Sequence, residues 1–352
     1  MDFELDEDEA LLATMAEKFT NGCTSGESRW VEMAEMGWFG CHLDEAAGGA
    51  GLGMSGAAIL MQAIGSAGLS DGMLGHSILG VTALAGSPRH AELLSRALAG
   101  DLKLGAAFAE AEFRHDLGTQ ATTATRTDTG WKLDGVKAPT LGCRDAGLIV
   151  VSAVGPTGDA CFFAVPADAP GLNVLPYPGP DERDVARLSL KGVAVAEGDR
   201  IKADPALTAR LQAALHIALA ADSCGAMHRL TQMTRTQLET RQQFGRAIGT
   251  FQALQHRYAD MHVALDEARA LMLAAAMATD AGASEAPTLA RKAWVQACWS
   301  GRRIAEEAVQ MHGANGMTSE CQVGFFVKRL TANIVVGGHA DLHLGMLAAQ
   351  AA

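Results

Sequence analysis

The hydrophobic pattern of this chain changes twice along its length, and this limits the possible fold more than any other feature. Residues 1–107 carry apolar side chains at helical spacing, residues 108–204 form short β-type runs between turns, and residues 205–352 return to long alanine-rich helical runs. The strand–helix alternation of a doubly wound parallel sheet is absent. We therefore expect an α+β chain with an N-terminal all-α domain over 1–107, a small β-barrel over 108–204 and a C-terminal four-helix bundle over 205–352.

Local signals support each part of this plan. In the first part, one helical stripe is formed by Leu11, Leu12, Met15 and Phe19. In the middle part, turn dipeptides such as Asp134-Gly135 and Pro170-Gly171 separate several short β-type runs, which is typical of a barrel or sandwich. The last part contains helical runs with short links, as an antiparallel bundle does, and they begin near Leu207, Phe251, Ser284 and Cys321.

Composition narrows the class of protein. The net charge is −12, whereas nucleic-acid-binding proteins usually present a basic patch, so we expect no nucleic-acid partner. The seven cysteines form no Cys-x-x-Cys pair, which is typical of reduced thiols in a cytosolic protein. The acidic N-terminus lacks the features of a targeting signal, and no run of roughly 18 apolar residues occurs, so we expect a cytoplasmic protein without membrane contact.

One glycine motif has the spacing of a nucleotide-binding fingerprint but not its context. Gly51-Leu-Gly53-Met-Ser-Gly56 fits the pattern G-x-G-x-x-G, which binds a dinucleotide only directly after a buried strand. The preceding residues 44–49 have no strand pattern. We therefore interpret this segment as a glycine loop without a cofactor.

Residues 240–261 carry a stronger signal for anion binding. A helix is expected to end at Gly245, a tight turn to follow, and a second helix to begin near Thr250. Arg241 provides a planar cation suited to phosphate, and Thr250 would cap a helix whose free N–H groups favour an anion. From these residues alone, the alternative interpretation is an ordinary turn with one surface arginine.

The wider sequence resembles the acyl-CoA dehydrogenase family. The resemblance rests on Arg241-x-x-Phe244-Gly245 with Phe251-Gln252 and, further along, on Gln310-Met-His-Gly-Ala-Asn-Gly-Met-Thr-Ser-Glu. It implies FAD as the cofactor, with Arg241, Phe244 and Gln252 meeting the FAD of a neighbouring subunit. Gln310, Gly313 and Ala314 would line the adenosine diphosphate half of that FAD. Pro139-Thr140-Leu141 stands where relatives have Trp-Ile-Thr, so Thr140 is the residue that would offer a hydroxyl to the flavin ring.

The resemblance also implies a reaction, and one group that this reaction needs is missing. Members of the family remove two hydrogens across Cα–Cβ of an acyl-CoA thioester, where a carboxylate takes the α-proton and flavin N5 accepts the β-hydride. The two positions that carry the glutamate base in relatives correspond here to Gly337 and Leu215. Neither side chain can abstract a proton.

Three residues are candidates to replace this catalytic base. Asp222 lies on the same helix face as Leu215, about 10 Å further along the axis, although a structural acid is the alternative. His216 could act as a base near neutral pH, although a buried structural histidine is the simpler interpretation. His339 stands at the usual threonine position beside the flavin. We expect no metal at His339-x-Asp341-x-His343, because alternating positions on a helix point apart and no further ligand cluster is present.

A narrower resemblance suggests the assembly. The segments 109–116, 251–257 and 327–331 resemble the small subunit of pimeloyl-CoA dehydrogenases and related two-subunit enzymes for steroid side chains. The first hypothesis is an FAD-dependent acyl-CoA dehydrogenase that passes electrons to an electron-transfer flavoprotein, as a homo-oligomer or with a larger acyl-CoA dehydrogenase subunit in an α2β2 tetramer. The second is a base-deficient partner that completes the FAD site of that larger subunit. A flavin-dependent monooxygenase on the same fold is the third.

Overall fold

The computed structural model describes residues 5–24, 28–70, 72–113, 116–201, 206–318 and 320–351, the last of them by its backbone alone. Arg114, His115 and Ser319, which belong to motifs named above, lie outside the described residues, as does the expected domain boundary at 204/205. The chain forms two compact units, each assembled from separate stretches of sequence. We describe the two units one at a time.

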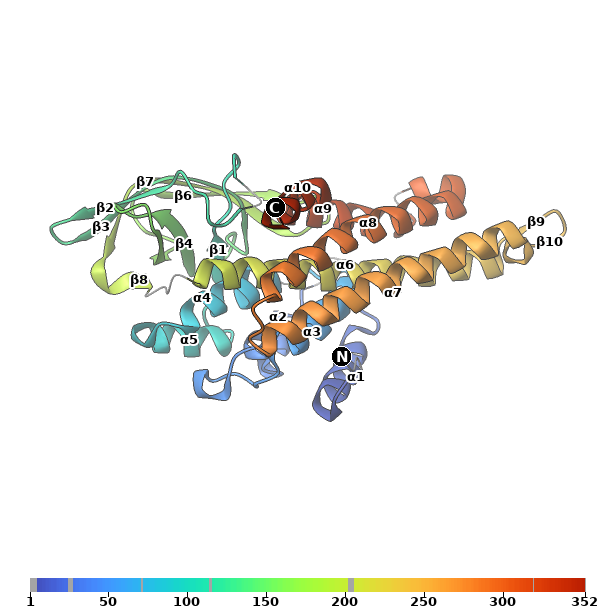
Figure 1. The fold of residues 1–352 in the computed structure, drawn as a ribbon, viewed down its shortest axis with the longest axis horizontal. Helices are drawn as coiled ribbons and strands as arrows, with labels where there is room; N and C mark the ends of the chain where they lie inside the picture. The colour runs from blue at the N-terminus through green and yellow to red at the C-terminus, as the bar shows by residue number, and fades with distance from the viewer. Residues whose placement is uncertain are drawn as a thin grey trace. The chain divides into compact units, whose positions relative to one another are not determined.

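The first unit is helical and comprises Met1–Glu27, Met54–Leu69 and His216–Ala352. Its helices are α1 (Glu7–Thr20), α3 (Gly53–Ala67), most of α6 (Leu207–Thr240), α7 (Gln252–Asp280), α8 (Ala286–His312), α9 (Val323–Gly337) and α10 (Ala340–Ala351). Helices α7 and α8 run side by side along most of their length (Figure 1). A hydrophobic cluster contributed by α6, α7, α8 and α9 forms the core and includes Leu230, Leu265, Ile304 and Phe326.

Polar contacts fix the ends of the shorter helices in this unit. The Asp6 side chain accepts a hydrogen bond from the Glu9 backbone N–H while the Glu9 side chain accepts one from Asp6, which is a complete capping box at the start of α1. At the start of α3, the free N–H groups of Met54 and Ser55 donate to the carboxylate of Asp280 at the end of α7. A negative charge at this position also complements the helix dipole.

Two glycines allow α3 and α6 to pack closely. A Cβ atom on Gly65 would overlap the carbonyl of Asp222, and a Cβ atom on Gly225 would overlap the carbonyl of Gln62. Any larger side chain at either position would push the two backbones apart. The segment around Asp222 is therefore held directly against α3.

The second unit comprises Ser28–Gly53 and Ser70–Leu215 and contains the main sheet. Its helical segments are α2 (Trp30–Glu35), a π-helical segment (Leu74–Val81), α4 (Thr82–Ala85) and α5 (Ala91–Leu98). The strands run in the order β6-β7-β3-β1-β4-β5-β8, and β2 pairs with both β3 and β4. Their bounds are β1 (Leu104–Ala107), β2 (Thr123–Thr127), β3 (Gly130–Leu141), β4 (Leu148–Val154), β5 (Ala160–Pro166), β6 (Leu172–Pro178), β7 (Asp184–Ala196) and β8 (Arg200–Ile201).

A buried ion pair ties the loop after β1 to the sheet. Lys137 on β3 is fully buried, and its ammonium group donates to the Glu110 carboxylate at 2.7 Å and to the hydroxyl of Ser152 at 3.2 Å. Glu110 in turn accepts the backbone N–H groups of Ala121 and Thr122. Burial lowers the pKa of Lys137 to about 8, against the opposing effect of Glu110. This network fixes both ends of the loop that precedes β2.

The predicted fold class is confirmed: helical N- and C-terminal parts flank a central antiparallel-rich sheet. The first strand of the sheet, β1, begins at Leu104, three residues before the boundary expected at 107/108. Within the described residues, the seven cysteines form no disulfide. Among the described residues, no helix is both long enough and apolar enough to cross a bilayer.

Candidate functional site

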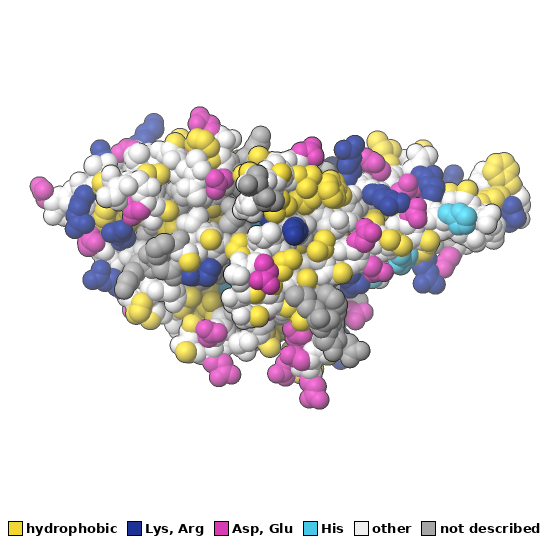
Figure 2. Space-filling model, in the orientation of Figure 1, with side chains coloured by type: hydrophobic (Ala, Val, Ile, Leu, Met, Phe, Trp, Pro, Cys, Tyr) yellow, Lys and Arg dark blue, Asp and Glu magenta, His cyan; other side chains and the backbone are white. Residues whose placement is uncertain are grey.

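The turn between α6 and α7 is a short β-hairpin that carries an exposed aromatic ring. Strands β9 (Gln242–Gln243) and β10 (Arg246–Ala247) pair antiparallel, and the two residues between them, Phe244 and Gly245, both have positive φ angles. A two-residue turn with this geometry fits the twist of a hairpin. It leaves the Phe244 ring 90% exposed at the tip. A group of apolar atoms lies at this end of the bundle in Figure 2.

The polar residues beside the hairpin also face outward. Arg241 and Gln252 are exposed, and within the described parts of the chain no ion pair involves Arg241. The Thr250 hydroxyl donates to the carbonyl of Ala247 at 2.7 Å, and α7 begins without a side-chain cap. The expected capping role of Thr250 is therefore wrong, because its hydroxyl closes the preceding turn instead. Arg241 is thus an exposed cation of the hairpin segment that the sequence singled out, as is Arg246.

The second motif lies at the end of α8. Gln310, Gly313 and Ala314 are all exposed. Gly313 has a φ of 64°, and its N–H donates to helix carbonyls, so this N–H closes α8. The hairpin segment and the end of α8 pack against one hydrophobic cluster, through Leu238 and Ile248 on one side and Val309 and Met311 on the other. The structure thus brings the two motifs to the same end of the helical unit (Figure 1).

Thr140 does not have the free hydroxyl that the sequence interpretation gave it. Its side chain is fully buried, and its Oγ1 donates to the carbonyl of Ala186 at 2.9 Å inside the sheet. The hydroxyl replaces part of the ladder at an irregular point in the β3–β7 register, which shifts between Lys137 and Thr140. A hydroxyl used in this way is not presented to a ligand.

Asp222 is a structural acid in this arrangement and not a base. Its carboxylate accepts hydrogen bonds from Nε and Nη2 of Arg329 on α9, the shortest at 2.6 Å, and from the Asn333 amide at 2.8 Å. Asp222 and Arg329 are 1% and 2% exposed. A carboxylate that is buried and hydrogen-bonded to a guanidinium and an amide is already engaged within the protein and is not presented to a substrate. The proposal of Asp222 as the base is therefore corrected.

His216 is buried among other aromatic and cationic groups. Its ring contacts that of His343 edge-on, with 4.8 Å between centroids, and it is 1% exposed. Burial, reinforced by His343 and Arg291, holds the pKa of His216 well below its usual 6.5. His343 donates from Nε2 to the carbonyl of Gly337 at 2.7 Å, if that nitrogen carries the proton. His216 fits the simpler interpretation of a neutral histidine in the core.

Gly337, the residue expected to stand at the position of the family's glutamate, is closely surrounded by other side chains. A Cβ atom on Gly337 would lie 2.7 Å from Leu219 Cδ1 and 2.8 Å from two carbons of the Trp294 indole. Trp294 is fully buried, and its Nε1 donates to the carbonyl of Gly338 at 2.9 Å. No side chain fits at position 337 unless Trp294 moves. Sequence reasoning singled out Gly337 but not Trp294, because the two residues lie on different helices.

His339, the third candidate, stands apart from this buried cluster. Its side chain is 62% exposed, and its only recorded ion pair within the described residues is a 3.6 Å contact with Asp341. Among the described residues, no group of three or more histidine, cysteine or acidic side chains is arranged to hold a metal ion. The three candidate bases thus do not form one site: Asp222 pairs with α9, His216 is enclosed, and His339 is exposed.

Comparison with known proteins identifies the class. The models for the acyl-CoA dehydrogenase N-terminal and C-terminal domains match residues 8–100 and 213–352. Together they match more than half of the chain, and the chain therefore belongs to the acyl-CoA dehydrogenase family.

Several relatives are informative. Acyl-CoA dehydrogenase IpdE2 of Mycobacterium tuberculosis is 31% identical over 217 residues, which are 55% of this chain and 66% of that protein, just under two thirds. In the ChsE4-ChsE5 complex from the same species, a chain covers this one to 99%, with a TM-score of 0.90 and 24% identity. A glutaryl-CoA dehydrogenase from Mycobacterium smegmatis, solved in complex with FADH2, has a TM-score of 0.89 and 20% identity over 98% of this chain and 95% of that one. At these identities the two structures support the fold.

Proposed function

We propose that this chain is a subunit of an FAD-dependent acyl-CoA dehydrogenase, and that it completes the cofactor site of a larger, base-carrying subunit while supplying no base itself. The observation that carries the proposal is the packing at Gly337. The space into which a glutamate would extend is filled by Trp294 and Leu219. If the space beside Gly337 were empty, a carboxylate from elsewhere could occupy it. Because the space is filled, no carboxylate can reach it.

The other candidate groups do not compensate for this loss. Leu215, at the alternative base position, is apolar and buried. Asp222 is committed to Arg329. His216 is enclosed, and a general base must come within hydrogen-bonding reach of the proton it removes. His339 is exposed and stands apart from the buried residues around Gly337. In this proposal the chain thus retains the family's cofactor motifs, while none of these residues acts as the base.

The exposed end of the helical unit fits part of an FAD. In the assembled enzyme, FAD supplies a hydride acceptor for the β-hydrogen of an acyl-CoA thioester. The exposed guanidinium of Arg241 suits a diphosphate, and the exposed amides of Gln252 and Gln310 offer both donors and acceptors. Phe244 offers an apolar surface to a neighbouring subunit. Gly313 and Ala314 would line the same half, through the backbone turn that ends α8. Thr140 is omitted from this set, because its hydroxyl is used inside the sheet.

The name of a relative supports the two-subunit arrangement. The ChsE4-ChsE5 structure is described as a complex, and a chain of it shares this fold over nearly the full length. In our proposal the acyl-CoA binds to the larger subunit's catalytic half, and the reduced flavin passes its electrons to an electron-transfer flavoprotein. A self-sufficient homo-oligomer is the alternative that the experiment must exclude.

The test is to purify the chain alone and together with a larger family member that retains its glutamate, and to record flavin absorbance before and after anaerobic addition of a panel of acyl-CoAs. We expect bleaching only in the co-purified complex. We also expect Arg241→Gln in this chain to lower the flavin content of the complex at least tenfold relative to Arg235→Gln, a control at an exposed arginine near the same end of α6. Bleaching of the chain alone would refute the proposal.

A further inference from the structure

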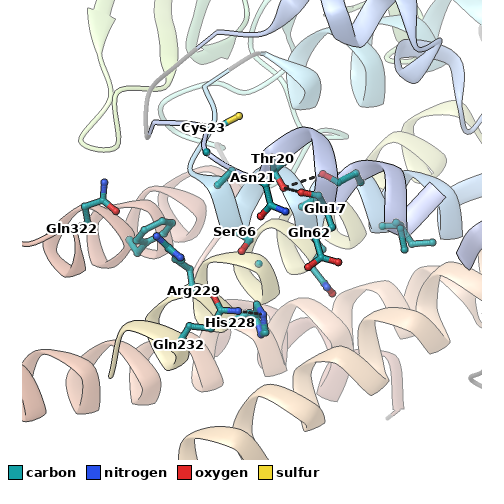
Figure 3. A pocket seen from close by; sticks show the side chains of 18 of the residues that line it. Glu17, Thr20, Asn21, Cys23, Gln62, Ser66, His228, Arg229, Gln232 and Gln322 are labelled. Carbon is teal, nitrogen blue, oxygen red and sulfur yellow. Dashed lines mark hydrogen bonds between the residues drawn. The ribbon is translucent and has the colours of Figure 1, made fainter. Parts of the chain in front are cut away.

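The first unit contains a pocket of about 480 Å³ that the proposed function does not use. It is lined by the end of α1, by α3, by the middle of α6, by Arg269 on α7 and by the start of α9. Figure 3 shows polar side chains from three of these helices around the same space, among them Gln62, His228, Arg229 and Asn21. A pocket of this volume accommodates a small organic molecule.

The pocket follows from how small residues are distributed on the three helices. Gly225 lets the backbone of α3 approach α6. One turn further along α6, the lining residues become His228, Arg229 and Gln232, which are larger and polar. Four of the facing positions on α1 and α3 are alanines, namely Ala13, Ala16, Ala63 and Ala67, and these small side chains leave space between the helices.

This pocket is separate from both regions discussed above. His228 lies about 18 Å along α6 from His216, which is beside the filled base position, at a rise of about 1.5 Å per residue. Counted in the same way along α6, His228 lies about 20 Å from Arg241 at the hairpin. A ligand in the pocket would therefore touch neither the base position nor the residues proposed to bind FAD.

The charges around the pocket favour an anion. Arg229 and Arg269 line it, and among the described residues neither has a recorded ion pair. The Nε of Arg269 donates to the amide oxygen of Gln62 at 3.3 Å, which orients the guanidinium. Glu17 is the carboxylate that lines the pocket. In a chain of net charge −12, this is a local excess of positive charge, and such a field concentrates anions.

We propose that this pocket binds a small organic anion, with Arg229 and Arg269 as the groups that hold its carboxylate or phosphate. Guanidinium groups suit both, because their planar N–H donors match two oxygens at once. Gln62, Ser66 and Asn21 add neutral donors and acceptors for the rest of the molecule. The residues of this site are distinct from those proposed to bind FAD.

Binding is coupled to proton uptake at His228. Burial lowers the pKa of His228, as do Arg269, His262 and Arg229, whereas Glu17 raises it. An anion in the pocket adds a negative charge beside the ring and so raises the pKa again. Anion binding and protonation of His228 therefore favour each other, and we expect the affinity to rise as the pH is lowered.

The test is calorimetric titration of the full-length chain with succinate, with inorganic phosphate and with neutral succinamide. We expect at least one of the two anions to bind with a dissociation constant below about 1 mM, and succinamide not to bind. Binding by succinate alone would identify a carboxylate site, and binding by phosphate alone a phosphate site. Both results support the proposal. It is overturned if neither anion binds at about 10 mM, or if succinamide binds as tightly.

Variants separate this pocket from adventitious surface binding. Arg269→Gln and Arg229→Gln should each weaken the affinity at least tenfold, whereas Arg302→Gln, at an exposed arginine of α8, should leave it unchanged. In the wild type, the binding enthalpy should vary with the ionisation enthalpy of the buffer. In His228→Gln this variation should disappear. Equal affinity in Arg269→Gln, Arg229→Gln and the wild type would overturn the proposal, whatever becomes of the proposed function.

Discussion

The two regions of the helical unit that the family motifs identify differ in how they are packed. Around Gly337 the interior is closed, because Trp294 and Leu219 occupy the space beside its Cα atom. The Gly337 carbonyl is also hydrogen-bonded to Nε2 of His343. At the hairpin, Phe244 and Arg241 are exposed and make few contacts within the chain. The first region is a packed interior, and the second is exposed to solvent. This contrast supports the proposal that the chain contributes to the cofactor site of another subunit without supplying the base.

The largest expected effect is at the buried ion pair. Asp222→Ala leaves the Arg329 guanidinium buried without its carboxylate, and we expect the free energy of unfolding to fall by about 3–5 kcal/mol. Urea denaturation followed by circular dichroism measures it. Asp341→Ala, at an acid whose side chain is 83% exposed, is the matched control and should change stability by less than about 0.5 kcal/mol. If Asp222→Ala lowered the free energy of unfolding by less than about 1 kcal/mol, the ion pair would not explain this acid, and a functional role for Asp222 would be favoured.

A smaller loss is expected at Gly337. Gly337→Ala adds a Cβ atom at 2.7–2.8 Å from Leu219 and Trp294, and overpacking of this kind typically costs about 1–3 kcal/mol. Gly345→Ala on α10 is the control, because a Cβ atom there meets no atom within 4 Å. The same denaturation experiment compares them. If Gly337→Ala were neutral, or if Gly337→Glu gained dehydrogenase activity without its partner, the closed interior would be wrong.

The free energy of unfolding is also expected to depend on pH, and the size of this effect is similar to or smaller than the loss expected for Gly337→Ala. His216 has a depressed pKa in the folded state, so below about pH 6.5 the unfolded chain binds more protons, and its stability falls as the pH is lowered. The contribution of this residue is at most about 1.4 kcal/mol per pH unit. His216→Gln should reduce the slope of unfolding free energy between pH 6.5 and 5, whereas His339→Gln at the exposed site should not. Equal slopes in all three proteins would contradict the buried neutral histidine.

The smallest effect on the chain itself is expected at the hairpin. Phe244→Ala removes a ring that is 90% exposed, so the free energy of unfolding of the isolated chain should change by no more than about 0.5 kcal/mol. The same change should weaken association with the larger subunit at least tenfold, measured by analytical ultracentrifugation of the mixture. A variant that assembles normally would show that the hairpin is an ordinary surface turn.

The sequence predicted the fold from features that depend on neighbouring residues. Helical periodicity, turn dipeptides and the two long family motifs are all local patterns, and they identified the helical and β parts and a turn between two helices, although α6 ends at Thr240 and not at the expected Gly245. Local patterns could not reveal contacts between distant segments. Asp222 looked free because Arg329, which neutralises it, comes more than a hundred residues later. Thr140 looked available because its bond to Ala186 depends on the register of β3 and β7.

The packing at Gly337 shows the same limit in a different form. From the sequence, a glycine at position 337 shows only that this position carries no carboxylate. Whether the space is open or filled depends on a tryptophan from α8 and a leucine from α6, and that depends on how the three helices pack. The proposed function therefore required the three-dimensional structure, although the sequence had already singled out Gly337.

Exposed apolar side chains at the hairpin and near the end of α8 affect the stability of the unassembled chain in the cell. Phe244 is 90% exposed, and Met317, just beyond the end of α8, is 78% exposed. Surface rings and thioethers of this kind promote self-association and recognition by quality-control proteases. In the proposed two-subunit arrangement, a chain synthesised in excess of its larger partner is therefore expected to be removed, so that its abundance in the cell would follow the abundance of the complex.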